Sequence, residues 1–170
     1  MPAADRPHAR PLALTAAALC LATGALAGPL DGKSYIIELS STQYDSGYGN
    51  YLFPPLASAL ARSGLRARNG PGADVVVNIQ TGSDVGKWLG AGENRVWTYA
   101  VGVTVGISPE SYTIPYEGTP AFGVEARLLT PNPDREDELS CLIRLAARTA
   151  IANYRPEGRL RVDGSACLRN

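Results

Sequence analysis

Asp84 and Glu93 lie on either side of a glycine-rich stretch, and their carboxylate side chains are suited to acid–base chemistry. A pair of carboxylates can hydrolyse a glycosidic bond, one as acid and the other as base or nucleophile. The spacing does not by itself bring the two together, and Asp is ordinary in a glycine-rich turn. A glycan-directed hydrolase that uses this pair is therefore kept as an alternative function.

Four aromatic residues form a candidate binding surface: Tyr44, Tyr48, Tyr51 and Trp88. Exposed aromatic rings stack on sugar faces or pack on proteins, because each combines apolar area with a polar tip. Asp45 and Asn50 lie in the same polar stretch and could hydrogen-bond hydroxyl groups. The alternative is structural, with the tyrosines covering a sheet edge.

Several other chemistries fit the sequence poorly. The only histidine is His8, close to the start, so the chain beyond it has none for a Ser-His-Asp or Cys-His site. Residues 82–87 suggest a phosphate loop, but they have three residues between the glycines, and Trp88 follows the lysine. The acidic run 134–138 lacks the alternating ligands of a calcium loop. We expect no metal and no cofactor.

The first 27 residues have the features of a cleaved secretory signal. Arg6 and Arg10 precede an uncharged stretch that ends in Ala25-Leu26-Ala27. That stretch is shorter than the roughly 20 residues that span a bilayer. We expect cleavage between Ala27 and Gly28, and hence a periplasmic or secreted protein without a membrane span.

Cys20 raises the alternative of a lipid anchor within this leader. Bacterial lipoprotein signals have a small residue just before the cysteine, whereas Leu19 is bulky and apolar residues continue beyond it. We therefore treat Cys20 as part of the apolar stretch. Lipidation there would instead place the protein at the outer membrane.

Cys141 and Cys167 remain after cleavage. An even pair in an oxidising compartment predicts a disulfide, which would stabilise the fold by roughly 3 kcal/mol in the chain-entropy model. The close Cys-x-x-Cys spacing of a redox pair is absent.

The remaining 143 residues, 28–170, suit one domain with a substantial core. They carry 14 basic and 15 acidic residues, and this near-neutral charge has no long basic run. The balance argues against nucleic acid and against an anionic membrane surface as partners.

The element pattern begins with a β-branched strand over residues 34–41 and a polar loop over 42–51. A short helix follows, with Pro54 and Pro55 in its first turn and Gly64 beyond its end. Residues 73–81 are a β-branched strand, and residues 82–94 are a glycine-rich connection.

Residues 95–107 alternate clearly and predict a long strand. One face would carry Trp97, Tyr99, Val101, Val103 and Val105, and the other Thr98, Ala100, Gly102, Thr104 and Gly106. We expect a helix to approach the small-residue face. If the Trp97 to Val105 face were left uncovered, it would be an interface between subunits.

A loop and another alternating strand over 121–129 come next, and they form an antiparallel hairpin with the preceding strand. The strongest helix follows, with apolar residues from Leu139 to Tyr154 at three- and four-residue spacing. Its acidic start includes Glu138, which we assign to the helix dipole. Residues 159–164 form a last short strand. The sequence thus predicts an α+β domain of order β-α-β-β-β-α-β, with a mainly antiparallel sheet of four to five strands and two helices on one face.

The order of elements over residues 54–80 resembles a pattern found in other proteins. A helix ending in Leu60-Ala61-Arg62-Ser63-Gly64 leads to the strand Ala73-Asp74-Val75-Val76-Val77. This pattern resembles small bacterial envelope proteins of unknown function, many of them lipoproteins. The resemblance implies an α+β domain with a long final amphipathic helix, and it implies no catalytic residues.

These observations favour an exported, non-enzymatic envelope protein. It would present its Tyr-rich loop and its Gly/Trp loop to a partner, either an envelope protein or a cell-wall glycan. The carboxylate hydrolase and a structural subunit of an envelope oligomer remain the alternatives, and the sequence leaves the oligomeric state open.

Overall fold

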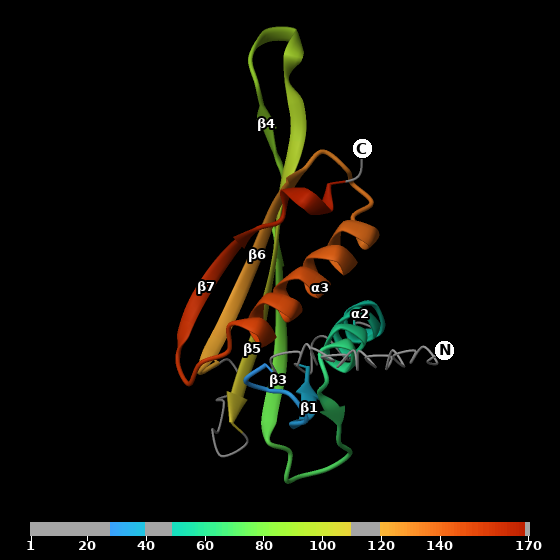
Figure 1. Cartoon of the computed structure of the whole chain (residues 1–170). Helices are drawn as coiled ribbons and strands as arrows, with labels where there is room; N and C mark the ends of the chain where they lie inside the picture. The colour runs from blue at the N-terminus through green and yellow to red at the C-terminus, as the bar shows by residue number, and fades with distance from the viewer. Residues whose placement is uncertain (1–27, 40–48, 110–119, 169–170) are drawn as a thin grey trace, which may run out of the picture.

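A computed structural model describes residues 28–39, 49–109 and 120–168 (Figure 1). Its strands are β1 (Ser34–Glu38), β2 (Arg66–Ala67), β3 (Val75–Ser83), β4 (Lys87–Leu89), β5 (Val96–Pro109), β6 (Phe122–Thr130) and β7 (Gly158–Asp163). Its helices are α2 (Gly49–Arg62) and α3 (Glu136–Ala152), with short 3-10 turns η1 (Gly92–Asn94) and η2 (Ser165–Cys167). The α+β class is confirmed, and the longer elements follow the predicted order.

The sheet is mixed, with strand order β2-β1-β3-β5-β6-β7 and β4 paired to β5 outside this path. The pairs β3–β5, β4–β5 and β5–β6 are antiparallel, whereas β1–β2, β1–β3 and β6–β7 are parallel. The expected four to five mainly antiparallel strands were therefore wrong in detail. Each helix connects two neighbouring strands, α2 between β1 and β3 and α3 between β6 and β7, and such a crossover makes them parallel.

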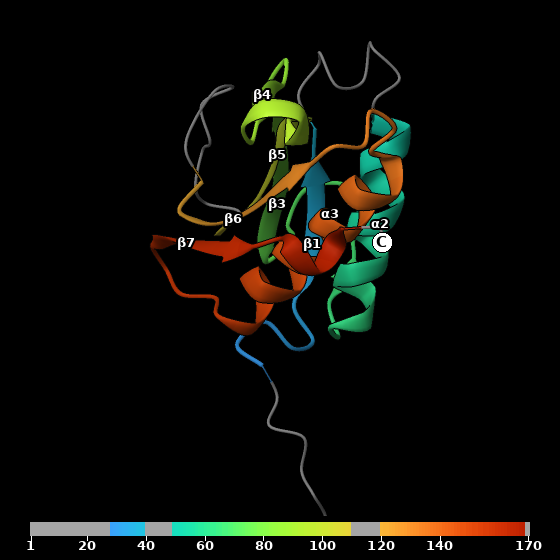
Figure 2. The ribbon, with the colours of Figure 1, turned by 90° about the horizontal axis from the view of Figure 1, so that it is seen from above.

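Both helices cover one face of the sheet, as predicted (Figures 1 and 2). The apolar stripe of α3 is buried, and Leu142, Ile143 and Ala147 are fully enclosed. They pack over alternate residues of the central strands, including Val103 and Val124. The two helices and the central strands therefore share one hydrophobic core, which holds the sheet against the helices.

The helices cover the opposite face of β5 from the one we expected. Val101, Val103 and Val105 are buried under them, so this stretch is not open as a subunit interface. The small residues instead make room for loop and side-chain atoms at one end of the sheet. A Cβ on Gly106 would lie 2.5 Å from the Pro120 side chain and would clash with that of Asn78.

Helix α2 begins earlier than the sequence suggested. It starts at Gly49, so Pro54 and Pro55 lie inside the helix and Tyr51 belongs to its first turn rather than to a loop. The buried side chains Leu52, Leu56 and Leu60 hold this helix in the core. The free energy gained by burying these leucines outweighs the cost of the backbone hydrogen bonds that the two prolines cannot donate.

Cys141 of α3 and Cys167 of η2 form a disulfide, the pair that the cysteine count predicts. The bond ties the segment after β7 to the first half of α3. Of the residues described, no helix is long and apolar enough to cross a membrane. Residues 1–27, including Cys20 and the cleavage position after Ala27, lie outside the described residues, as do Tyr44 and Tyr48.

Candidate functional site

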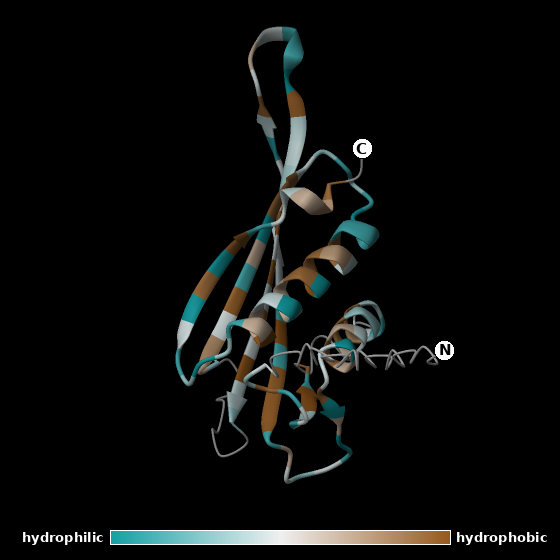
Figure 3. Cartoon of the chain, viewed as in Figure 1, coloured by the Kyte–Doolittle hydropathy of each residue, from teal (hydrophilic) through white to brown (hydrophobic). Residues whose placement is uncertain are grey.

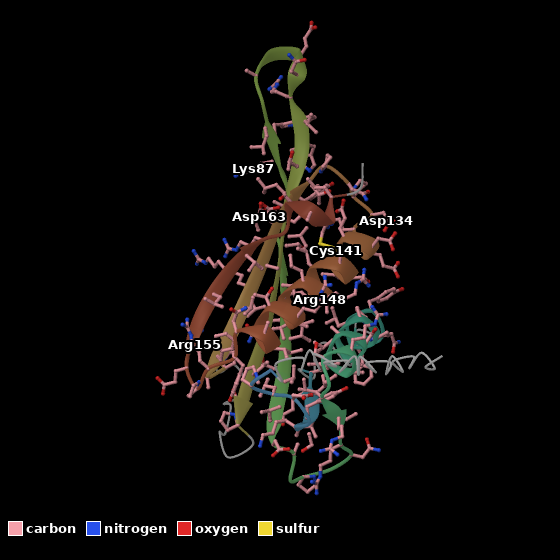
Figure 4. All side chains as sticks on the ribbon, viewed as in Figure 1. Lys87, Asp134, Cys141, Arg148, Arg155 and Asp163 are labelled. Carbon is pink, nitrogen blue, oxygen red and sulfur yellow. A yellow bond between two sulfur atoms is a disulfide. The ribbon has the colours of Figure 1, made fainter. Side chains whose placement is uncertain are left out.

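A β-hairpin projects from the end of the sheet, and we call its residues 84–99 the arm (Figure 1). It contains β4, η1 and the first residues of β5, with Lys87 paired to Thr98, Trp88 to Trp97 and Leu89 to Val96. The glycine-rich stretch that the sequence indicated as a connection is thus a structured hairpin. Figure 4 shows Lys87 near the base of the arm, just above Asp163.

Asp84 fixes the base of the arm. Its Oδ1 accepts hydrogen bonds from the backbone N–H of Gly86 at 3.1 Å and of Ala100 at 2.8 Å. Between the Ser83–Val101 and Lys87–Thr98 pairs, one strand has an extra residue, which defines a β-bulge. The Asp84 carboxylate therefore replaces backbone contacts that the bulge interrupts.

Gly86 lies directly beneath an indole ring. Its φ is +86°, and a Cβ there would lie 2.3 Å from Trp97 Nε1. Only glycine meets both conditions without strain, because it tolerates positive φ and adds no atom under the ring. The Trp97 ring therefore packs against the bulge at Gly86, and this contact orients the ring.

An aromatic row follows the same face of the arm. The Trp88 and Trp97 rings meet edge to face, with centroids 5.3 Å apart and an interplanar angle of 81°. The Arg135 guanidinium lies 4.4 Å from the centre of the Tyr99 ring, a cation–π contact that links the row to the start of α3. The two tryptophans are the only ones in the sequence.

The arm exposes apolar side chains on both faces. Trp88 is 58% exposed, Trp97 37% and Val85 90%. Leu89 and Val96 are also exposed, and because side chains alternate along a strand they lie on the face opposite the tryptophans. Figure 3 shows hydrophobic segments on both strands of the arm, away from the core. Of these residues, the sequence pointed to Trp88 as a binding residue and to Trp97 as part of a possible subunit interface, but not to Val85, Leu89 or Val96.

The two carboxylates singled out in the sequence do not meet. Asp84 lies at the base of the arm, and Glu93 lies in η1 at its tip. The strand from Asp84 to Leu89 alone spans roughly 16 Å at 3.3 Å per residue. The carboxyl groups of glycosidases are only about 5–9.5 Å apart, so this pair lacks the geometry of the hydrolase alternative.

Tyr51 and Trp88 belong to separate surfaces. Tyr51 is exposed on α2 and lines a cavity of about 450 Å³ with Thr81, Ser83 and Arg135. Trp88 belongs to β4. In Figure 1, β4 lies in the hairpin that projects beyond the end of the main sheet. Among the described residues, the predicted platform is therefore divided.

A shallow groove of about 880 Å³ lies below the arm, mainly on the face of the sheet that the helices leave open. Its floor contains Gly82, Ala100 and Gly102, and Leu129 is exposed at its side. Glu125 in this groove forms ion pairs with Arg127 and Arg161. Desolvation raises the pKa of Glu125, but the hydrogen bonds and charges of the two arginines outweigh it and lower the pKa overall.

No family model matches the chain, and no curated protein matches it. Among solved structures, it is similar to one described as a minor lipoprotein from Acinetobacter baumannii, at 16% sequence identity and a TM-score of 0.40. The match covers 71% of this chain and 87% of that one. A likeness this loose says nothing about function.

Proposed function

We propose that this protein is an exported, non-enzymatic binding module that docks on a partner protein of the cell envelope through the arm. The observation that carries the proposal is the exposure of Trp88, Leu89 and Val96 on two faces of one projecting hairpin. Exposed apolar side chains gathered on one projecting element mark an interaction site, and tryptophan is enriched among residues that dominate binding energy.

The arm is built before any partner arrives. Asp84 closes the bulge, Gly86 seats Trp97, and Trp97 in turn supports Trp88 edge to face. A preformed element loses little conformational entropy on binding, so more of its contact energy appears as affinity. This arrangement supports a docking role better than a passive connection would.

The geometry of the tryptophan pair favours a protein over a glycan. Stacking on successive sugars requires flat, accessible ring faces. Rings at 81° to one another do not form one plane, and an edge-to-face pair fits an irregular apolar pocket instead. Binding to a glycan is a distinct outcome of the test below.

Export is part of the proposal. The leader-like residues 1–27 support it, as does the disulfide between Cys141 and Cys167, because such bonds persist in oxidising compartments.

The test is site-specific photocross-linking in cells that express the full chain. A benzoylphenylalanine in place of Trp88 should give a discrete adduct with a protein other than this chain. The same group in place of Phe53, which is 48% exposed on α2, is the matched control and should give none of that adduct. Equal adducts from both positions, or none from position 88, would refute the docking role of the arm.

The adduct partner is then purified and its affinity for the protein is measured. Trp88→Ala should weaken binding at least tenfold, as expected for a central aromatic anchor, whereas Phe53→Ala should change it by less than twofold. Sedimentation with purified peptidoglycan tests the other class of partner. Retention there that is lost in Trp88→Ala would replace the protein partner with a glycan.

A further inference from the structure

The edges of the sheet differ in how well they are protected against pairing with another strand. On the outer strand β7, Arg159 and Arg161 are exposed, and such charges discourage pairing. At the opposite end, β2 has only two residues, one of them Arg66. The outer edge of β4 has Trp88 and Leu89 and a single charge, Lys87. Among the described strands, it is one of two weakly guarded edges in the arm, the other being the outer edge of residues 96–98 of β5, beyond the start of β6.

The direction of the backbone groups on β4 follows from β5. The Ala100 N–H donates to Asp84 and so points to the β4 side. Successive residues of a strand alternate their hydrogen-bonding edge, so Thr98 and Val96 point the same way. Their partners Lys87 and Leu89 therefore bond inward. The N–H and C=O of Trp88 point outward, to the open edge.

We infer that β4 pairs antiparallel with β4 of a second copy of this chain, so that two arms form one four-stranded ribbon. This inference rests on the proposed function, since it makes the docking surface a dimeric one. An isolated two-stranded hairpin is only marginally stable, and added strands stabilise it. Pairing of identical antiparallel strands is two-fold symmetric by construction, as in most homodimers.

The residues of β4 are complementary to themselves in this arrangement. Pairing centred on Trp88 places it opposite the second copy's Trp88, and Lys87 opposite the second copy's Leu89, so no like charges face each other. Gly86 falls opposite Gly90, so neither end of the contact has a bulky side chain. The ribbon would bring four tryptophans onto one face.

The first test is the mass of the purified protein by sedimentation equilibrium at tens of micromolar. The wild type should sediment as two chains. Trp88→Pro removes the outward N–H, which a proline at an edge tolerates, and it should raise the dimer dissociation constant at least tenfold. Val85→Ala, at the most exposed apolar residue of the arm, is the control and should change it less than twofold. A single-chain mass for the wild type, or an unchanged constant in Trp88→Pro, overturns the inference.

The second test does not depend on how Trp88→Pro folds. Directly paired residues have Cα atoms about 5.5 Å apart, within disulfide range. Trp88→Cys should therefore give a covalent dimer under mild oxidation. Lys87→Cys should not, because the two copies of residue 87 would lie roughly 8 Å apart in this register. Equal cross-linking of both variants, or none in Trp88→Cys, would exclude the register.

The outcome separates this inference from the proposed function. A single-chain protein that still gives the partner adduct at position 88 would remove only the dimer. A dimer without any partner adduct would remove only the docking role.

Discussion

At the scale of single residues, the two tryptophans have different tasks. Trp97 lies on Gly86 and is part of the scaffold of the arm, whereas Trp88 contacts Trp97 and is otherwise largely exposed. Substitutions at Trp97 should therefore disturb the hairpin, and substitutions at Trp88 should disturb mainly binding. For this reason, the binding experiments use position 88.

Glu138 shows how a single residue can depart from its pattern. The sequence placed it among the acidic residues at the start of α3, but it is 1% exposed, and its Oε1 accepts a hydrogen bond from the buried Thr130 hydroxyl at 3.0 Å. Its Oε2 has no hydrogen-bond partner among the described residues. Helix periodicity alone would have found it, because Glu138 precedes Leu139 and Leu142 on the buried face.

Asp74 supplies a residue-scale prediction on pH. Its carboxylate accepts hydrogen bonds from the backbone N–H and the hydroxyl of Ser34, both at 2.7 Å, and lies 3.3 Å from Lys33 Nζ. The backbone bond from Ser34 is the largest of these influences, and together they lower the Asp74 pKa from 3.8 to about 2. A lowered pKa stabilises the fold above pH 3.8, and this contribution is lost as the pH falls towards 2.

We therefore expect Asp74→Asn to lower the melting temperature at pH 7, with the difference from wild type shrinking as the pH falls from 4 to 2. Thermal unfolding followed by circular dichroism across this range measures it. A difference that stays constant with pH would show that the charge of Asp74 does not contribute.

At the scale of elements, the arm depends on its bulge. We expect Gly86→Ala to destabilise the hairpin by about 1–3 kcal/mol, because the new methyl group requires positive φ and meets the Trp97 ring. Amide hydrogen exchange at Thr98 and Leu89, which bond across the arm, should become roughly tenfold to hundredfold faster.

The matched control is Gly92→Ala, at the tip. Its φ is also positive, at +58°, but a Cβ there meets no atom within 4 Å. Its effect on exchange should be smaller, with only the backbone cost of about 1 kcal/mol. If both variants exchanged equally fast, the contact between Gly86 and Trp97 would not be what supports the arm.

The elements also show what the sequence could predict. The stripe of α3 and the alternation of β5 gave the correct element types because each follows one period over many residues. Short strands such as β2 have too few residues to show any period. The parallel pairs were missed because strand pairing depends on how a crossover helix returns the chain, and no local pattern records that.

The length of β5 is a sequence signal for the arm, but the unbroken alternation of large and small residues along the strand obscures it. Trp97 and Tyr99 continue the large-residue face of β5, and the alternation alone therefore predicts that they form one surface with the valines. Yet β5 has 14 residues, whereas its neighbours β3 and β6 have 9 each. A strand longer than both neighbours must extend past the sheet, and its first residues then lack a covering layer.

At the scale of the whole molecule, a sheet covered by helices on one face continues into a hairpin that no helix covers. The two helices occupy one face, the disulfide ties the segment after β7 to α3, and the arm extends beyond both helices (Figure 1). The residues that stabilise the fold are therefore different from the residues that we propose for docking. Changes at the exposed tips of the arm should leave the core of Leu142, Val103 and Val124 intact.

Tryptophan fluorescence tests the central claim most directly, because both tryptophans of the chain lie on the arm. Emission and acrylamide quenching are measured with the purified protein before and after saturation with the partner identified by cross-linking, itself chosen or altered to contain no tryptophan. We predict a shift of the emission to shorter wavelength and at least a twofold drop in quenching. An unchanged spectrum and unchanged quenching in a complex shown to have formed would contradict docking through the arm.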